Sequence, residues 1–484
     1  MIRFPKKITL VLSIVPVVLS CDQFLEETPD NRVELNTVEK AAQLLTNGYP
    51  QASYNFTEWM SDNVSFTFGT FKQPEHNEAY RWEEVTAIFQ DTPTYFWNSA
   101  YEAIAHANEA LAVIDDLEGD DGRRAAVKGE ALLIRAYNHF MLVNLFAKHY
   151  DLQDSRKDPG VPYVEEPERV FIKKYTRNTV REVYDLVERD LLEGLKLVND
   201  SYYANSGKYH FTKNAALAFA SRYYLFRREY QKCIEYSTQA LGSNPERFIK
   251  NIPALLAERI NTEDYVRLYT SPTDDSNLLL LKQITNFHVN VGYWPSNEMY
   301  NYFSQVNPFF AEDVRFGSAY VRGENGIQIP KFEFLFERSS LSSNVGINYT
   351  IALGFRGEEV LLNRAESYAL LGRLDEAIAD LQLLINYRYV DDQPLTLSIE
   401  RLRSYYGIPN DDQFVVFIYV LDERQKEFLH EGLRWFDIRR YGIPVAHVLE
   451  DEQTVIELEQ DDPRKTLLIP KAAVDVGGLE QNKR

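Results

Sequence analysis

The chain has 484 residues, with 72 acidic against 52 basic side chains, so its formal net charge is −20 at pH 7. This charge opposes binding to nucleic acid or to anionic lipid, and we expect no nucleic acid partner. Aromatic residues make up 13% of the sequence, with 31 Tyr and 28 Phe, a composition suited to neutral polar ligands such as glycans.

The N-terminus has the pattern of a secretory signal. Arg3, Lys6 and Lys7 precede an uncharged stretch, "ITLVLSIVPVVLS", which ends at Ser20. A basic start, a short apolar region and a small residue at its end are typical of a signal peptide. The stretch is shorter than the roughly 20 apolar residues that span a bilayer. We therefore expect residues 1–20 to be a signal peptide and not an anchor.

Cys21 stands directly after this segment, in the run "VLSC". The run resembles a bacterial lipobox, although Leu19 is bulkier than the small residue usual at that position, and an unmodified cysteine is the alternative. Several acyl chains on one cysteine would tether the protein firmly, whereas a single chain binds only marginally. Cys233 is the only other cysteine, so acylation of Cys21 leaves no disulfide. We predict that Cys21 is the lipidation site.

Residues 21–36 are acidic, contain Pro29 and have the character of an extended tether of some tens of ångströms, at about 3.3 Å per residue. Helices dominate after the tether, because apolar residues recur at spacings of three and four. The predicted helices cover residues 38–54, 94–117, 123–149, 178–198, 212–228, 230–242, 356–371, 374–388 and 421–439.

Two of the predicted helix pairs have the spacing of a tetratricopeptide repeat (TPR). Small, aromatic, turn and small residues recur at matching positions, with twelve residues from first to last. The later copy has Ala365, Tyr368, Gly372 and Ala377; the earlier copy has Ser221, Tyr224, Arg228 and Cys233. This spacing predicts close helix packing, and it explains Cys233 as a small buried residue.

Residues 244–352 and 55–93 are rich in Asn, Ser, Gly and aromatics and poor in helical periodicity. A rigid scaffold that carries long irregular segments is a common way to build a binding surface. Sugars stack on flat aromatic faces while amides, carboxylates and guanidinium groups bond their hydroxyls. The candidate ligand contacts in these segments are Trp82 with Tyr80 and Arg81, Trp294 with Tyr293 and Asn297, and Trp59.

For each of these three tryptophans, packing against the scaffold is the alternative. We expect Trp97 and Trp435 to lie in the core. The net charge favours neutral or cationic ligands, although Arg315, Arg322, Lys331 and Arg338 would form a local basic patch that suits an anionic one.

Motifs for catalysis and for cofactors are missing from the sequence. It has no phosphate-binding loop, nucleophile elbow or dinucleotide fingerprint, and its eight histidines show no metal-ligand spacing. Carboxylate pairs for glycoside hydrolysis are uninformative among 72 acids. We expect no enzyme activity, no cofactor and no metal site.

The most specific segment is "LDERQKEFLHEGLRWFDIRRYG", residues 421–442. Its aromatic residues are expected to be buried, and its charged residues to pair at offsets of three and four. The segment resembles the C-terminal signature of the SusD/RagB family of outer-membrane nutrient-binding lipoproteins. Further similar pieces follow the family's order: "CDQFLEETPD", "GVPYV", "PSNEMYNYF", "EVLLNRAESYALLG" and "LEQN".

The resemblance implies a mostly helical fold in which a TPR-like scaffold carries a variable, loop-rich sub-region. We expect scaffold at residues 37–243 and 353–390, and a ligand-binding or capping sub-region with the signature at 244–352 and 391–484. Family members lie on the outer membrane, lipid-anchored and facing the exterior, as lids over a SusC-like TonB-dependent transporter. They capture oligosaccharides or polysaccharides without catalysis. A peptide-binding lid, a surface glycosidase and a purely structural scaffold are the alternatives.

Overall fold

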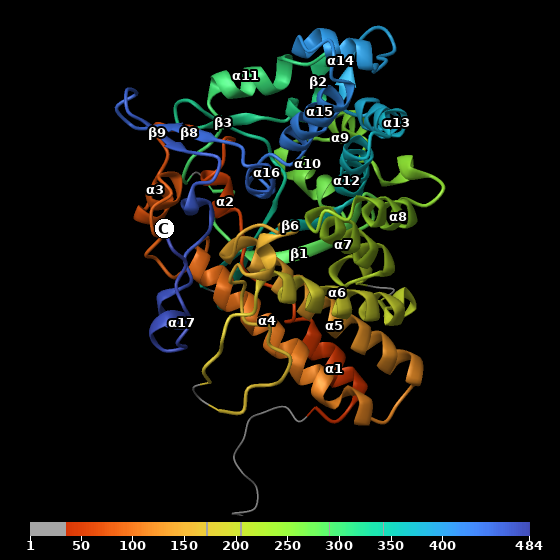
Figure 1. Ribbon diagram of the computed structural model, residues 1–484, viewed down its shortest axis with the longest axis vertical. Coiled ribbons are helices and arrows are strands. Elements are labelled where there is room, and N and C mark those ends of the chain that lie inside the picture. Colours follow the sequence, from red (N-terminus) through yellow and green to blue (C-terminus); the bar gives the residue numbers. More distant parts are fainter. Residues whose placement is uncertain (1–34, 171–172, 204–205, 290, 342) are drawn as a thin grey trace, which may run out of the picture. The chain divides into compact units, whose positions relative to one another are not determined.

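The computed structural model describes residues 35–170, 173–203, 206–289, 291–341 and 343–484 (Figure 1). The predicted signal peptide, Cys21 and most of the predicted tether lie outside these residues. Every assigned helix and strand belongs to the unit formed by residues 36–484. The fold is mostly helical, as predicted. Within the described ranges, no helix combines the length and the apolar character that a membrane span requires.

The longer helices pack on one another largely in chain order: α4 on α5, α5 on α6, α7 on α8, α8 on α12 and α12 on α13. Most of the predicted boundaries are correct within about three residues, but the first helix ends at Leu45 and not at residue 54. The bounds are α1 (Val38–Leu45), α4 (Pro93–Val113), α5 (Asp121–Phe146), α6 (Val180–Leu197), α7 (Lys213–Phe226), α8 (Tyr230–Leu241), α12 (Gly357–Leu370), α13 (Leu374–Ile385), α14 (Ile399–Tyr406), α15 (Asp412–Glu427) and α16 (Arg434–Tyr441).

The helix ends have local causes. Thr179 and Glu182 form a capping box at the start of α6, in which each side chain accepts a hydrogen bond from the other's backbone N–H. Such boxes satisfy amide groups that have no partner inside the helix. The whole of α5 after its first turn and a half is buried or nearly so, and its buried charged residues have partners on other elements: Glu130 accepts from Tyr203, and Arg135 donates to Asp190.

The two predicted TPR-like pairs are confirmed as α7–α8 and α12–α13. Ser221, Cys233, Ala365 and Ala377 are fully buried where the helices of each pair meet. The turns are also equivalent, because Arg228 (φ 65°) and Gly372 (φ 72°) both adopt the left-handed conformation. Cys233 is a buried free thiol whose pKa burial raises to about 11, which makes it unreactive at neutral pH.

A small sheet and short elements are inserted between the two pairs, in residues 244–352. The sheet is antiparallel with the order β1-β6-β5, so β6 is central and β5 is an edge strand. Its strands and the neighbouring elements are β1 (Asn277–Ile284), β3 (Tyr320–Arg322), β4 (Gly326–Gln328), β5 (Glu333–Arg338), β6 (Gly346–Arg356), α9 (Ile252–Glu258), α10 (Thr262–Tyr269), α11 (Asn297–Gln305) and the 3₁₀ turn η7 (Val314–Phe316).

The segment 55–93 packs against this inserted region, and the residues that meet are more than 200 positions apart in the chain. Bridges join Ser65 to Trp294 and Phe71 to Val291. The remaining elements are α2 (Phe56–Trp59), α3 (Pro74–Tyr80), the pair β2 (Glu312–Asp313) with β7 (Tyr389–Val390), the hairpin β8 (Val445–Val448) with β9 (Val455–Leu458), and α17 (Lys471–Asp475). The two segments that share an unusual composition therefore form one region.

The prediction of a single helix over residues 421–439 is wrong. The chain leaves α15 after Glu427 and enters α16 at Arg434, with His430 (φ 74°) and Gly432 (φ 73°) in left-handed conformations between them. The buried carboxylate of Glu58 accepts the backbone N–H groups of both residues, at 2.6 and 3.1 Å. These two hydrogen bonds stabilise the loop in a non-helical conformation and prevent a continuous helix.

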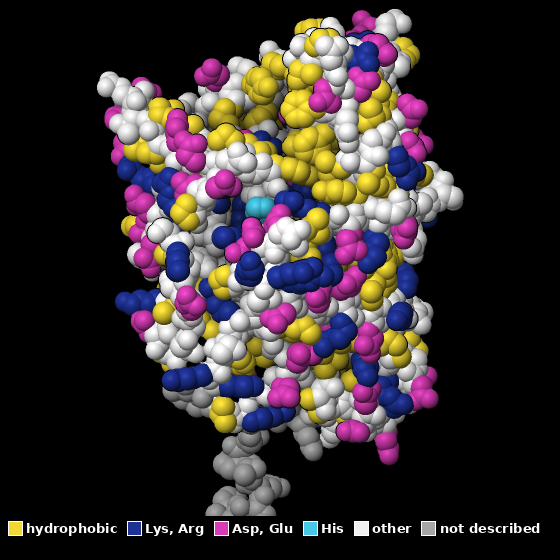
Figure 2. All heavy atoms as spheres, viewed as in Figure 1, with side chains coloured by type: hydrophobic (Ala, Val, Ile, Leu, Met, Phe, Trp, Pro, Cys, Tyr) yellow, Lys and Arg dark blue, Asp and Glu magenta, His cyan; other side chains and the backbone are white. Residues whose placement is uncertain are grey.

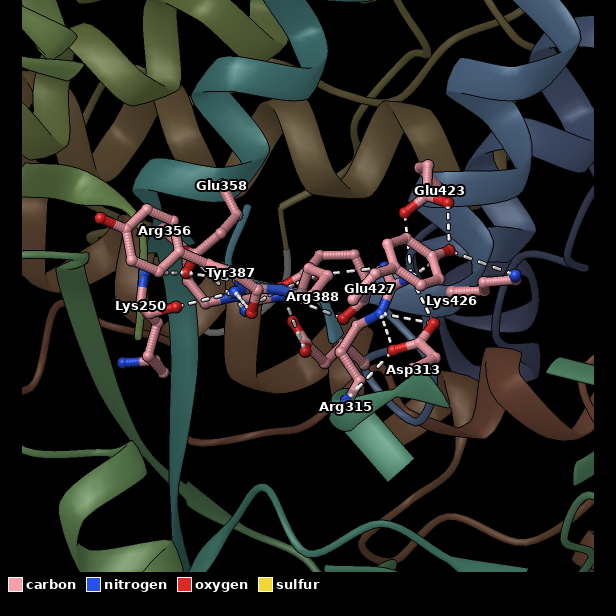
Figure 3. A network of polar contacts seen from close by, with 12 residues as sticks. Lys250, Asp313, Arg315, Arg356, Glu358, Tyr387, Arg388, Glu423, Lys426 and Glu427 are labelled. Atoms are coloured by element: carbon pink, nitrogen blue, oxygen red, sulfur yellow. Dashed lines mark hydrogen bonds and ion pairs between the residues drawn. The ribbon is translucent and has the colours of Figure 1, made fainter. Parts of the chain in front are cut away.

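Asp437 and Arg440 of this segment form an ion pair at the predicted offset of three. Most of its other charged residues have partners elsewhere in the chain, and several of them belong to a buried ion network around Glu427 (Figure 3). Arg388, Arg356 and Arg315 converge on the Glu427 carboxylate. The members come from the scaffold, from β6 and from η7. The network therefore fixes the inserted region to the scaffold.

Candidate ligand-binding site

A pocket of about 850 Å³ lies in the inserted region, between α10, the β3–β4 hairpin and the start of β5. We call it the α10–β4 pocket. Its volume is within the range of about 300–1,000 Å³ that is usual for small-molecule sites. Aromatic and polar side chains share its walls: His288, Tyr320, Phe332 and Phe334 with Asn261, Asp264, Arg267, Arg322, Gln328 and Asn348.

Arg322 is held in a fixed position by neutral groups. Its guanidinium donates to Gln328 Oε1 (2.5 Å), to the Tyr320 hydroxyl (2.7 Å) and to the His288 carbonyl oxygen (2.9 Å). It also lies over the Tyr320 ring, 4.6 Å from the centroid. Among the described residues no carboxylate pairs with Arg322, so its charge is available to a ligand.

His288 and Phe334 form an aromatic wall of the pocket. Their ring centroids are 4.6 Å apart, and Phe334 is 47% exposed, so part of its ring is open to solvent. His288 Nδ1 is 3.0 Å from the Thr350 hydroxyl, while Nε2 is buried and has no partner among the described residues. Burial, with a contribution from Arg322, lowers the pKa of His288 to about 4, so the imidazole is neutral at physiological pH.

These aromatic and polar side chains are of the types that can contact a sugar. An exposed aromatic face accepts the apolar C–H side of a sugar ring, and it does so at low entropic cost because the ring is rigid. Guanidinium and amide groups donate to hydroxyl oxygens, and carboxylates accept from hydroxyl hydrogens. The α10–β4 pocket supplies all of these groups, and Arg322 is already oriented by its three hydrogen bonds.

The candidates around Trp82 are brought together, but in the interior. The rings of Tyr293, Tyr80, His447 and Trp82 form a continuous stack, with successive centroids 3.9, 4.1 and 4.4 Å apart. Trp82 is 1% exposed, and its indole N–H donates to the Met60 carbonyl. These aromatic residues are buried and not exposed, and His447 of β8 lies between the rings of Tyr80 and Trp82.

Trp59 and Trp294 are likewise fully buried, at 0% exposure. Each packs against Phe287, with centroids 5.5 and 5.4 Å apart. Trp294 is nevertheless linked to the pocket, since the Arg322 guanidinium lies 5.9 Å from its ring centroid. Direct ligand contact by these tryptophans stays an untested prediction. Trp294 lies on the interior side of Arg322, where its ring can support the guanidinium group.

The two polar candidates, Arg81 and Asn297, lie in different environments. Arg81 forms an ion pair with Glu450 at 2.7 Å. Asn297 is exposed at the start of α11. Neither lines the α10–β4 pocket.

Of the predicted basic patch, Arg322 and Lys331 line the α10–β4 pocket, but Lys331 is paired with Glu431. Arg315 and Lys331 are buried in the ion network with Asp313 and Glu431, and Arg338 is exposed at the end of β5. The sequence missed Tyr320, Gln328, His288 and Phe334. The three consecutive apolar residues in "FEFLF", Phe334 to Phe336, were a usable signal, because successive side chains of a strand point to opposite faces and cannot all enter one core.

The comparisons with known proteins agree with this architecture. A family model described as the SusD family matches residues 286–473, and a second, described as starch-binding and associating with the outer membrane, matches residues 23–225. SusD-like protein P38 of Formosa agariphila is 23% identical over 89% of this chain and 90% of its own length.

Solved structures share the fold. A SusD superfamily protein from Bacteroides thetaiotaomicron has a TM-score of 0.68 at 22% identity and covers 93% of this chain and 100% of its own. A laminarin-binding SusD-like protein has a TM-score of 0.60 at 17% identity, with 92% and 98% covered. At these identities the likeness shows the fold alone.

Scaffold, inserted region and pocket together define a TPR-like helical protein whose inserted region contains a pocket. The two family matches cover both the scaffold and the C-terminal signature. The chain belongs to the SusD/RagB family, and the resemblance noted in the sequence is confirmed.

Proposed function

We propose that this protein is a cell-surface lipoprotein that captures oligosaccharides in the α10–β4 pocket and delivers them to a SusC-like TonB-dependent transporter. Residues 37–243 and 353–390 serve as the scaffold, and residues 244–352 and 391–484 as the binding and capping part. The observation that carries the proposal is the pocket itself, where the exposed Phe334 ring faces the same space as the oriented Arg322. Family membership supports it.

The proposed role is binding without catalysis. A glycosidase needs a carboxylic acid whose pKa is raised so that it is protonated at neutral pH. Asp264 lines the pocket, but a hydrogen bond from Arg267 holds its pKa below the ordinary value. Glu333 accepts a long hydrogen bond from Thr270. Overnight incubation with a bound oligosaccharide should therefore release no reducing sugar.

Replacing Arg322 by Ala is expected to weaken binding of the protein's glycan at least tenfold, which corresponds to about 1.4 kcal/mol. The substitution removes a fixed donor from the pocket and frees Gln328 and Tyr320 to move. Titration calorimetry of the mature protein against a polysaccharide panel measures the affinity. Phe334→Ala should show a similar loss, because it removes the stacking face.

Arg338→Ala is the matched control, since Arg338 is an exposed arginine at the far end of β5. It should bind like the parent protein. Equal affinities of the parent, Arg322→Ala and Phe334→Ala for every glycan would disprove the pocket assignment. Binding of peptides with no response to any glycan would favour the peptide-binding alternative.

Cys21→Ser is expected to release the protein from the outer membrane. Serine cannot form the thioether to the lipid, so the exported chain loses its acyl chains. Fractionation of cells should find the variant in soluble fractions and the parent in the outer membrane. Membrane retention of the variant would contradict lipidation at Cys21 as the anchor.

A further inference from the structure

Phe310 combines two unusual properties. It is 89% exposed, and its φ is 56°, in the left-handed region. Bulky residues adopt this conformation rarely, and such strained positions concentrate at functional sites. A large apolar side chain in solvent contributes no burial that would compensate for the strain. The packing of Phe310 itself therefore does not explain its conformation.

The strain is imposed by the buried side chain of Asn307. Its Oδ1 accepts the backbone N–H groups of Phe309 (3.0 Å) and Ala311 (3.3 Å), and its Nδ2 donates to the Ala311 carbonyl (2.8 Å). Phe309 is buried against Tyr389, with centroids 5.7 Å apart. Because both of its neighbours are anchored, Phe310 is held rigidly outward.

Phe310 borders a hollow of about 450 Å³ between α11 and η7. A second aromatic ring, Tyr300, lines the hollow and packs edge-on against Phe316, at 5.7 Å. Ser304, Gln305 and Glu312 add a hydroxyl, an amide and a carboxylate. Among the described residues Glu312 makes no ion pair, so its carboxylate is available as an acceptor.

The surrounding surface is also apolar. Figure 2 shows hydrophobic side chains gathered over the upper elements, around α11 and α15. Tyr302 of α11 and Val306, the residue directly after this helix, are exposed hydrophobic residues. A purely apolar patch would suit a protein partner, but the hollow beside Phe310 has polar groups on α11 and at Glu312. This mixture matches a hydroxyl-rich ligand better.

We propose that Phe310 is the stacking platform of a second carbohydrate subsite, with Tyr300, Ser304, Gln305 and Glu312 as its other contacts. The proposal rests on the proposed glycan-binding function and extends it to a position outside the α10–β4 pocket. The ligand class is a neutral sugar ring, because the carboxylate of Glu312 would repel an acidic one. Asn307 acts as a positioning residue that fixes the platform.

The test uses titration calorimetry of the full mature chain against laminarin, starch, xylan and mannan. Phe310→Ala and Phe310→Gly should each reduce the affinity for the glycan that the parent binds at least tenfold, while Phe310→Trp retains it. Glycine relieves the strain at positive φ, so Phe310→Gly should unfold at the same temperature as the parent or higher. Leu371→Ala, at an exposed apolar position in the α12–α13 turn, should bind normally.

The outcomes separate this inference from the proposed function. A parent that binds glycan, with Phe310→Ala and Phe310→Gly equally tight, overturns the second subsite and leaves the function intact. A parent that binds no glycan overturns both. Loss of binding in all three Phe310 variants with lowered unfolding temperatures would assign the residue to the fold and overturn the platform role.

Discussion

Replacing Glu427 by Gln is expected to lower the free energy of unfolding by about 3–5 kcal/mol, the usual cost of breaking a buried ion pair from one side. The Glu427 carboxylate accepts from Arg388 at 2.7 and 3.0 Å and from Arg356 at 3.0 Å. Glutamine would remove the counter-charge that these two buried guanidinium groups share and would turn an amide N–H₂ toward them, leaving Arg388 with Glu358 and Arg356 with Glu431. Denaturant unfolding monitored by tryptophan fluorescence measures the change.

The electrostatics of this site explain the size of the effect. Burial raises the pKa of Glu427, but Arg388 and Arg356 outweigh burial and hold that pKa well below its usual range. The ionised form is therefore the one that the fold stabilises. Because Glu427 joins α15 to β6 and η7 (Figure 3), its loss should loosen the inserted region first.

Glu337→Gln is the matched control. Glu337 pairs with Lys282 at 3.2 Å, and both side chains are largely exposed. Exposed pairs contribute about 0–1 kcal/mol, so this variant should unfold almost like the parent. If Glu427→Gln were as stable as Glu337→Gln, the network would not be what fixes the inserted region.

The scaffold was predictable because helix packing has a local signature. Small residues at Ser221 and Cys233, and again at Ala365 and Ala377, are required wherever two helices approach closely. The turn between the helices needs a left-handed residue, and Gly372 is the usual solution. Arg228 occupies the same conformation without being glycine, so the spacing was a better guide than the residue type.

The break between α15 and α16 was not predictable in the same way. Its cause is Glu58, which lies 372 residues before His430 in the chain and accepts the N–H groups of the loop. Burial raises the pKa of Glu58 to about 7, although the hydrogen bonds from the loop act to lower it. A periodicity calculation over residues 421–439 contains no information about this carboxylate.

The candidate site, too, could be predicted from the sequence only in part. Composition grouped the segments 55–93 and 244–352, and the structure shows that they meet in space. It did not separate exposed from buried rings, because irregular segments lack the periodicity that marks an inner and an outer face. Trp82 and Trp294 therefore belong to the interior, while Phe334 and Phe310 face solvent.

Trp294→Ala is expected to lower the free energy of unfolding by about 3–5 kcal/mol, as for other large-to-small substitutions in a core. The ring packs against Phe287 and His430, and its removal would leave a cavity beneath Arg322. Thermal and denaturant unfolding measure this loss. Any drop in glycan affinity of this variant has two explanations, lost ligand contact or a displaced Arg322.

Trp294→Phe separates the two explanations. Phenylalanine keeps an aromatic ring beneath Arg322, and loss of the indole N–H should cost little because it has no partner among the described residues. If Trp294 acts by supporting Arg322, the variant should keep the parent's affinity. A tenfold loss of affinity in Trp294→Phe at unchanged stability would instead restore Trp294 as a ligand contact, and would require the pocket to open down to its ring when a glycan binds.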